Sequence, residues 1–213
     1  MSIGAIALVF LAAMQALAVA TVMPIVSADL DGEALYAVAF SATLAASVVG
    51  MVGAGAWSDR RGPGIPLTAA VGAFVAGLVL ASAAPTMEVF VAGRLMQGLG
   101  GGGITVALYV VVARAYPSEL HGRVFAAFSA AWVVPSLVGP FAAGAVAQYA
   151  HWRWVFVGVA VLAIAAYSLL LGRLGALGAD TSAHVRSRLA GDLAAAIAVA
   201  LGLMLIGVAG RTG

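Results

Sequence analysis

The chain has 213 residues, of which 64% are hydrophobic and 8% are charged, and its formal net charge is +2. Soluble globular domains carry about 25% charged residues, so this composition excludes a water-soluble fold and favours an all-α protein that crosses a membrane several times. The absence of cysteine excludes disulfides, thiol catalysis and cysteine-bound metals, and the small, dispersed positive charge indicates no nucleic-acid partner.

Apolar runs of membrane-spanning length follow one another along the chain. Each is close to the roughly 20 residues that a helix needs to cross a bilayer. The predicted spans are residues 3–26, 36–57, 65–84, 89–112, 124–149, 154–174 and 193–209. No basic segment precedes the first run and no small-residue cleavage site follows it, so we expect this run to be retained as a span.

The connections between the spans are short except for residues 175–192, which are polar and rich in glycine. We therefore predict a six-helix transmembrane domain at residues 1–174, a cytoplasmic linker at 175–192, and the start of a second transmembrane half at 193–213. A seventh span without further partners would be an unusual design. We expect the chain to be incomplete and to require a C-terminal half.

The distribution of arginine predicts how the spans are oriented. Only Arg153 belongs to the first, third and fifth connections, which also hold Asp29, Asp31, Glu33 and Glu88. The even connections hold or flank Arg60, Arg61, Arg114, Arg123, Arg173, Arg186 and Arg188. Since basic residues accumulate on the cytoplasmic side, we expect a multi-pass protein of the inner (plasma) membrane with a cytoplasmic N-terminus.

Charged residues interrupt the apolar sequence between the second and third spans. Asp59, Arg60 and Arg61 are followed by glycines and prolines, which helices tolerate poorly. The pattern predicts that one helix ends near Trp57 and that the next begins near Ile65. The charges are interpreted either as a membrane-topology signal or as a structural latch.

The fourth span contains an arginine at a depth where charge is costly. Placing Arg94 inside the bilayer costs at least about 2.5 kcal/mol, which usually marks a functional residue. Gln97 lies one turn further along the same helix face. The alternative is that Arg94 extends to the outer interface. The run Gly100–Gly103 allows close helix packing and is also expected to loosen this helix locally.

The fifth span combines prolines with glycines. Pro135 and Pro140 each remove a backbone hydrogen bond and are expected to bend the helix, while Gly139 and Gly144 give the bend room against a neighbour. An ordinary proline kink remains the alternative. The histidines lie in separate predicted connections, so no metal or acid–base cluster is expected. The chain also has no lysine and no phosphate-binding loop, so no ATP site is expected.

Together these motifs resemble the major facilitator superfamily, and its drug/proton antiporters in particular, over essentially the whole chain. Gly55, Asp59, Arg60 and Gly62 match the superfamily's motif between spans two and three, with Trp57 at a leucine position and Pro63 and Gly64 in place of two basic residues. Arg94 and Gln97 match the fourth-span motif. Residues 132–144 resemble the antiporter signature, to which Pro135, Gly139, Pro140 and Gly144 belong. Gln15 occupies the acidic position of a first-span motif.

The resemblance implies a six-helix half made of two inverted three-helix repeats, followed by a seventh helix. It implies a secondary active transporter, with no enzymatic activity and no cofactor, that exports small amphipathic or drug-like molecules in exchange for protons by alternating access. The aspartate motif would act as a conformational latch between the halves. The cavity or proton pathway would include Gln15, Arg94, Gln97 and Trp132. The alternative is a truncated or half-size permease fragment without transport activity of its own.

Overall fold

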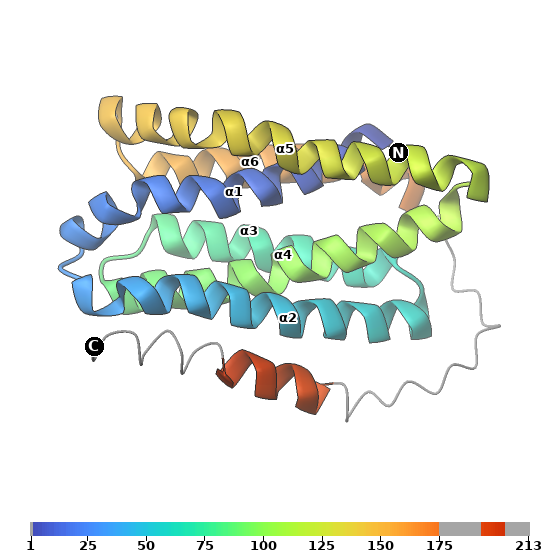
Figure 1. The fold of residues 1–213 in the computed structure, drawn as a ribbon, viewed down its shortest axis with the longest axis horizontal. Coiled ribbons are helices and arrows are strands. Elements are labelled where there is room, and N and C mark those ends of the chain that lie inside the picture. Colours follow the sequence, from blue (N-terminus) through green and yellow to red (C-terminus); the bar gives the residue numbers. More distant parts are fainter. Residues whose placement is uncertain (1, 175–192, 203–213) are drawn as a thin grey trace.

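The computed structural model describes residues 2–174 and 193–202, and these residues form an all-α bundle. Six helices are long and apolar enough to cross a membrane, which confirms the predicted fold class. They are α1 (Ser2–Asp29), α2 (Tyr36–Arg61), α3 (Gly64–Ser82), α4 (Met87–Ala115), α5 (Ser118–Tyr149) and α6 (Arg153–Leu174), with a 3₁₀ turn η1 (Glu33–Leu35) before α2. A shorter apolar helix, Leu193–Gly202, lies beside α2 (Figure 1). Residues 203–209 of the predicted seventh span lie outside the described residues.

Several helices extend beyond the apolar runs that predicted them. The prediction that the second helix ends near Trp57 is wrong, because α2 continues to Arg61. Similarly, α5 begins at Ser118, six residues before the predicted start of the fifth span at residue 124. Hydropathy marks only the part of a helix that lies in hydrocarbon, and the helix itself continues into polar surroundings. The basic residues in the last turn of α2 also interact favourably with the helix dipole.

A glycine ends α2. Gly62 has a φ angle of 77°, a left-handed conformation that is costly for any other residue type, and its N–H donates to the Ser58 carbonyl oxygen at 2.9 Å. The following residue, Pro63, precedes the first turn of α3. Pro66 lies inside that first turn, where a missing N–H has no helical partner to lose. The glycine and proline cluster therefore produces the tight reversal that the sequence predicted.

The packing of the helices has an internal two-fold pattern. Helix α1 packs against α5 and α6, helix α4 packs against α2 and α3, and α3 also contacts α6. Exchanging α1 with α4, α2 with α5 and α3 with α6 reproduces the same set of contacts. This is the relation expected between two inverted three-helix repeats, and it appears in the contacts although the two repeats cannot be aligned by eye from the sequence.

Helix α4 is clamped between α2 and α3 by its glycines. A Cβ atom added to Gly98 or Gly102 would overlap the backbone of α2 at Thr43 or Ser47, and one added to Gly100 would overlap the backbone of α3. The helix is continuous from Met87 to Ala115. The expectation that the glycine run loosens α4 is therefore wrong, since close backbone packing on two sides holds these residues in a helix.

One end of the bundle is joined by a polar network that the sequence did not predict. Asp29 Oδ2 accepts a hydrogen bond from Trp152 Nε1 at 2.9 Å and pairs with Arg153 Nη1 at 3.3 Å. Arg153 Nη2 donates to the Ala84 carbonyl oxygen at 3.0 Å, and the guanidinium lies 4.4 Å from the centre of the Trp152 ring. These contacts connect the end of α1, the α3–α4 turn and the α5–α6 corner. Within residues 2–174 and 193–202, Asp29–Arg153 is the one salt bridge.

Candidate functional site

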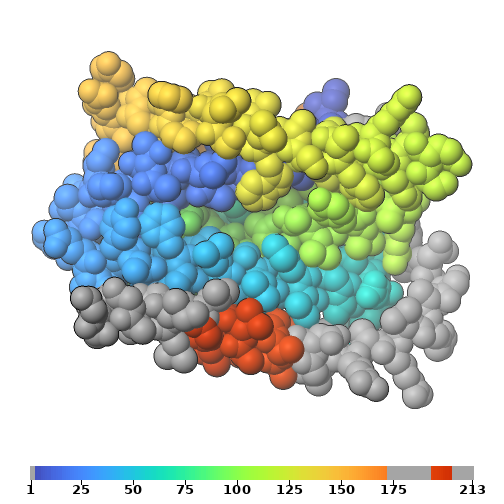
Figure 2. Space-filling view, in the orientation of Figure 1, coloured from blue at the N-terminus to red at the C-terminus, as the bar shows by residue number. Residues whose placement is uncertain are grey.

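A cavity of about 240 Å³ lies between α1, α2, α4 and α5, with one aromatic side chain contributed by α3. In Figure 2 the molecular surface is hollowed on this side, where α4 is set back between α2 and α5. The lining residues are Ala12, Gln15, Ala16, Thr43, Leu44, Ser47, Met51, Phe74, Arg94, Gln97, Gly98, Gly101, Gly102, Thr105 and Trp132. Gln15, Arg94, Gln97 and Trp132, which the sequence analysis selected from three separate spans, thus line a single cavity.

Arg94 points into the bundle rather than towards its surface. Its side chain is only 3% exposed, and its Nη1 atom donates to Gln97 Oε1 at 2.5 Å. Gln97 Nε2 in turn donates to the carbonyl oxygen of Gly77 on α3 at 3.4 Å. The one-turn spacing predicted this pairing of Arg94 and Gln97. The inward direction of Arg94 speaks against the alternative in which the side chain extends to the outer interface.

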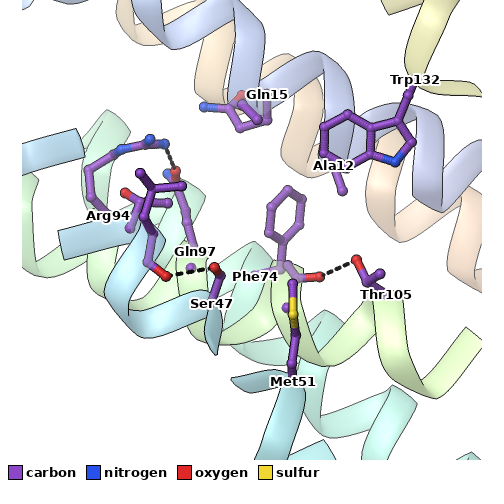
Figure 3. Close-up of a pocket in the computed structure, with 15 residues that line it drawn as sticks. Ala12, Gln15, Ser47, Met51, Phe74, Arg94, Gln97, Thr105 and Trp132 are labelled. Atoms are coloured by element: carbon purple, nitrogen blue, oxygen red, sulfur yellow. Dashed lines mark hydrogen bonds between the residues drawn. The ribbon is translucent and has the colours of Figure 1, made fainter. Parts of the chain in front are cut away.

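Gln15 approaches Arg94 from the opposite wall of the cavity. The Gln15 side chain is 2% exposed, and its amide points towards the guanidinium (Figure 3). Neither Gln15 Oε1 nor Nε2 has a hydrogen-bond partner within the described part of the chain, and the same holds for Arg94 Nε. A buried amide without partners is expensive, so these atoms are candidates for contact with a ligand or with water.

The second helix contributes a polar stripe that the sequence analysis missed. Thr43 and Ser47 line the cavity four residues apart on α2, and the apolar Met51 follows at the same spacing. The Thr43 hydroxyl donates to the Ala39 carbonyl oxygen at 3.0 Å, and the Ser47 hydroxyl donates to that of Leu44 at 2.7 Å. Such bonds within a helix satisfy a hydroxyl in apolar surroundings. The four-residue spacing of polar side chains in an apolar span was the signal that could have identified this wall.

The fifth helix divides its motif residues between two faces. Trp132 lines the cavity and is about half exposed. Pro135 and Gly139 are buried, and the Gly139 and Gly144 positions lie within contact distance of α1. The helix is continuous through both Pro135 and Pro140. The proline and glycine motif therefore forms the α1–α5 contact, while Trp132 faces the cavity.

The residues of the predicted latch lie at the C-terminal end of α2. Asp59 and Arg60 are exposed in the last turns of α2, and Gly62 ends the helix. Asp59 lies beside the helix predicted to begin the second half, in a shallow groove lined by Val48, Met51, Val52, Gly55, Ala56, Asp59, Ala195, Ala196 and Val199. A neighbouring contact was missed by the sequence analysis, in which Arg114 Nη2 of α4 donates to the Ser58 carbonyl oxygen at 3.3 Å.

The chemistry of the cavity is suited to binding. The lining combines apolar side chains with hydroxyls, two amides and one permanently charged guanidinium, and it contains no carboxylate. Among the described residues, no group of three His, Cys, Asp or Glu side chains is arranged to hold a metal ion. The fold and its composition together define a multi-pass α-helical membrane protein with an internal cavity.

Comparison with known proteins identifies the family. The model of the Major Facilitator Superfamily matches residues 5–183. A probable multidrug-efflux transporter of Mycobacterium tuberculosis is 33% identical over 151 residues, which are 71% of this chain and 32% of that protein. An MFS-type transporter of the acurin A biosynthesis cluster in Aspergillus aculeatus is 34% identical over 147 residues, which are 69% of this chain and 26% of that protein. The chain belongs to the Major Facilitator Superfamily.

Solved structures show the same fold at low sequence identity. A proton:xylose symporter, XylE, aligns with a TM-score of 0.72 at 14% identity, over 97% of this chain and 51% of the symporter. A peptide transporter, POT, aligns with a TM-score of 0.68 at 15% identity, over 95% of this chain and 45% of the transporter. This chain therefore spans about half of these solved chains and about a third or less of those two sequence relatives. Members of the superfamily are transporters and not enzymes, as the sequence predicted.

Proposed function

We propose that the chain forms the N-terminal half of a secondary active transporter, which exports small amphipathic or drug-like molecules in exchange for protons by alternating access. The observation that carries this proposal is the cavity between α1, α2, α4 and α5, which combines buried polar groups with apolar walls. Such a combination is typical of a site for small molecules. The similarity to a probable multidrug-efflux transporter supports export as the direction.

The proposed transporter contains a second transmembrane half that begins at residue 193, joined to the first by a linker at residues 175–192. The N-terminus and this linker are proposed to lie in the cytoplasm, with the protein in the inner (plasma) membrane. The arginines near the even connections support this orientation. The two halves would rock about a common central site, of which the cavity described here forms one wall.

The proton pathway is proposed to involve both halves. The cavity lining holds no carboxylate, and Gln15 stands where the resemblance places an acidic residue. A proton-binding group is therefore expected in the second half.

Filling the cavity is expected to abolish export. A Cβ atom added to Gly101 would meet only the Phe74 ring at 3.9 Å, so the larger side chain of Gly101→Leu fits by projecting into the cavity that Gly101 lines. We expect normal insertion and loss of nearly all transport. The measurement uses everted membrane vesicles containing the complete transporter, in which an added amphipathic dye should dissipate a preformed proton gradient.

The matched control for this experiment is Gly72→Leu on α3. A Cβ atom at Gly72 would meet nothing within 4 Å, and the residue is exposed on the outside of the bundle. This variant should transport like the parent protein. Parent-like proton release by Gly101→Leu at equal expression would contradict the proposal that substrates pass through this cavity. Dye export without any proton movement would contradict proton coupling.

Removing the charge of Asp59 is expected to slow transport about two- to fivefold without affecting insertion. In the proposed latch, Asp59 would approach the start of a helix in the second half. A carboxylate near a helix N-terminus contributes about 0.3–1 kcal/mol, and losing it shifts the balance between conformations by a corresponding factor. The test compares efflux rates of Asp59→Asn and Asp31→Asn in the complete transporter. Asp31 lies near the opposite end of the bundle and is exposed, so its variant should behave as the parent. An unchanged rate for Asp59→Asn would reduce this stretch to a topology signal.

A further inference from the structure

The cavity has two chemically different ends. Arg94, Gln97 and Gln15 lie together at one end, while Phe74 and Trp132 lie towards the other (Figure 3). Met51 and Leu44 of α2 add further apolar lining. A molecule that fills this cavity is therefore held in one direction, with a polar group towards Arg94 and an apolar body towards the two aromatic rings.

The polar end carries a positive charge that the cavity does not neutralise. Arg94 remains protonated under all physiological conditions because of the high intrinsic pKa of a guanidinium. Its hydrogen-bond partner Gln97 is a neutral amide, and none of the residues lining the cavity is a carboxylate. A buried charge without a counter-charge is costly, so an anionic group entering this end is strongly favoured over a neutral or cationic one.

The hydrogen-bonding groups at this end are also suited to an acceptor. Arg94 Nε is a buried donor without a partner in the described residues, and the Gln15 amide faces it with no partner of its own. The two side chains come from different helices, α4 and α1, so an acceptor placed between them would join the walls of the cavity. A carboxylate offers two acceptor oxygens in the plane that a guanidinium recognises.

We propose that this cavity binds amphipathic organic acids, with the carboxylate held between Arg94 and Gln15 and an aromatic or aliphatic body packed against Phe74 and Trp132. The proposal rests on the proposed transport function and specifies its substrate class. It predicts discrimination against lipophilic cations, whose charge would be repelled by Arg94. The competing possibility is that a carboxylate from the second half neutralises Arg94, which would leave no preference for acids.

The test is a binding measurement on the purified complete transporter, which requires neither a proton gradient nor transport. Three probes share one aromatic body, namely 2-naphthylacetic acid, its primary amide, and 2-(2-naphthyl)ethylamine. Isothermal titration at neutral pH, where the acid is ionised, should show the acid binding about tenfold more tightly than the amide. The amine should bind more weakly than either.

Variants connect this preference to the named residues. Arg94→Ala should remove the difference between the acid and the amide, and Arg94→Lys should retain the preference at reduced affinity because it keeps the charge but loses the planar donor pair. Gln15→Ala should weaken binding of the acid about threefold to tenfold. The matched controls are Arg123→Ala and Gln148→Ala, which remove an exposed arginine and an exposed glutamine from α5. These should bind all three probes like the parent.

Several outcomes would overturn the proposal. Equal binding of acid and amide by the parent protein would show that Arg94 is already neutralised. Failure of the acid to bind, or tighter binding of the amine, would exclude organic acids as the substrate class. These rankings are measured on the unmodified protein, so they stand even where an Arg94 variant fails to fold. None of these outcomes would contradict the proposed transport function. That function is tested separately by proton movement in vesicles and by the loss of this movement in Gly101→Leu.

Discussion

Replacing Trp152 by alanine is expected to lower the free energy of unfolding by about 3–5 kcal/mol, the usual cost of truncating a large buried aromatic side chain. Trp152 is 1% exposed and packs edge-to-face against Phe90 and Phe156, with ring centres 5.9 Å away in both cases. The substitution also removes the indole donor to Asp29 and the ring beneath the Arg153 guanidinium. The contacts that join the end of α1, the α3–α4 turn and the α5–α6 corner would therefore be weakened.

The neighbouring Trp154 is the matched control for this prediction. It is 60% exposed on the outside of the bundle, so Trp154→Ala is expected to change stability by no more than about 0.5 kcal/mol. Thermal unfolding of the purified complete protein, followed by circular dichroism, gives the comparison. Similar midpoints for the two variants would contradict the role assigned to Trp152.

Replacing Gly102 by leucine is expected to prevent normal packing of the bundle, at a cost of about 3 kcal/mol or more. A Cβ atom at this position would overlap the backbone of Ser47, including its carbonyl oxygen. No side-chain rotation relieves an overlap with backbone, so α2 and α4 would have to separate. The helix propensity gained on replacing glycine, about 1 kcal/mol, is too small to offset this cost.

The adjacent residue provides a sharp comparison for the Gly102 prediction. Gly101 lines the cavity, and a Cβ atom there makes only ordinary contacts. Gly101→Leu should therefore yield a folded protein that does not transport, whereas Gly102→Leu should yield little monodisperse protein. Size-exclusion chromatography and thermal midpoints of both variants separate loss of folding from loss of function. Equal stability of the two variants would contradict the backbone contact between α2 and α4.

The sequence predicted the helices themselves well but their ends less accurately. All six long helices occur where apolar runs were found, because a bilayer requires long continuous hydrophobicity. The ends of α2 and α5 were misplaced, since a helix continues past the hydrocarbon wherever its backbone bonds are satisfied. The effect of the glycine run on α4 was also misjudged. Local helix propensity favours loosening, but packing against two neighbours opposes it.

The candidate site was predicted in part. Arg94 stood out because a charge inside a span is costly, and Gln15 stood out because it occupies the acidic position of a first-span motif. Both observations depend only on position in the sequence. The polar stripe at Thr43 and Ser47 was missed because hydroxyls are common in membrane helices and satisfy themselves locally. The contact between Asp29 and Trp152 joins residues 123 positions apart, which no local pattern indicates.

The sequence by itself determined that this is a multi-pass α-helical protein of the Major Facilitator Superfamily, because hydropathy, span length and short motifs are local properties of the chain. Only the tertiary structure decided which faces of the helices meet. In the folded bundle Arg94 points inward and Gln15 lies opposite it, and alternate glycines of α4 contact α2 and α3. These arrangements depend on the fit between helices distant in the sequence, and this fit is a property of the whole packed bundle.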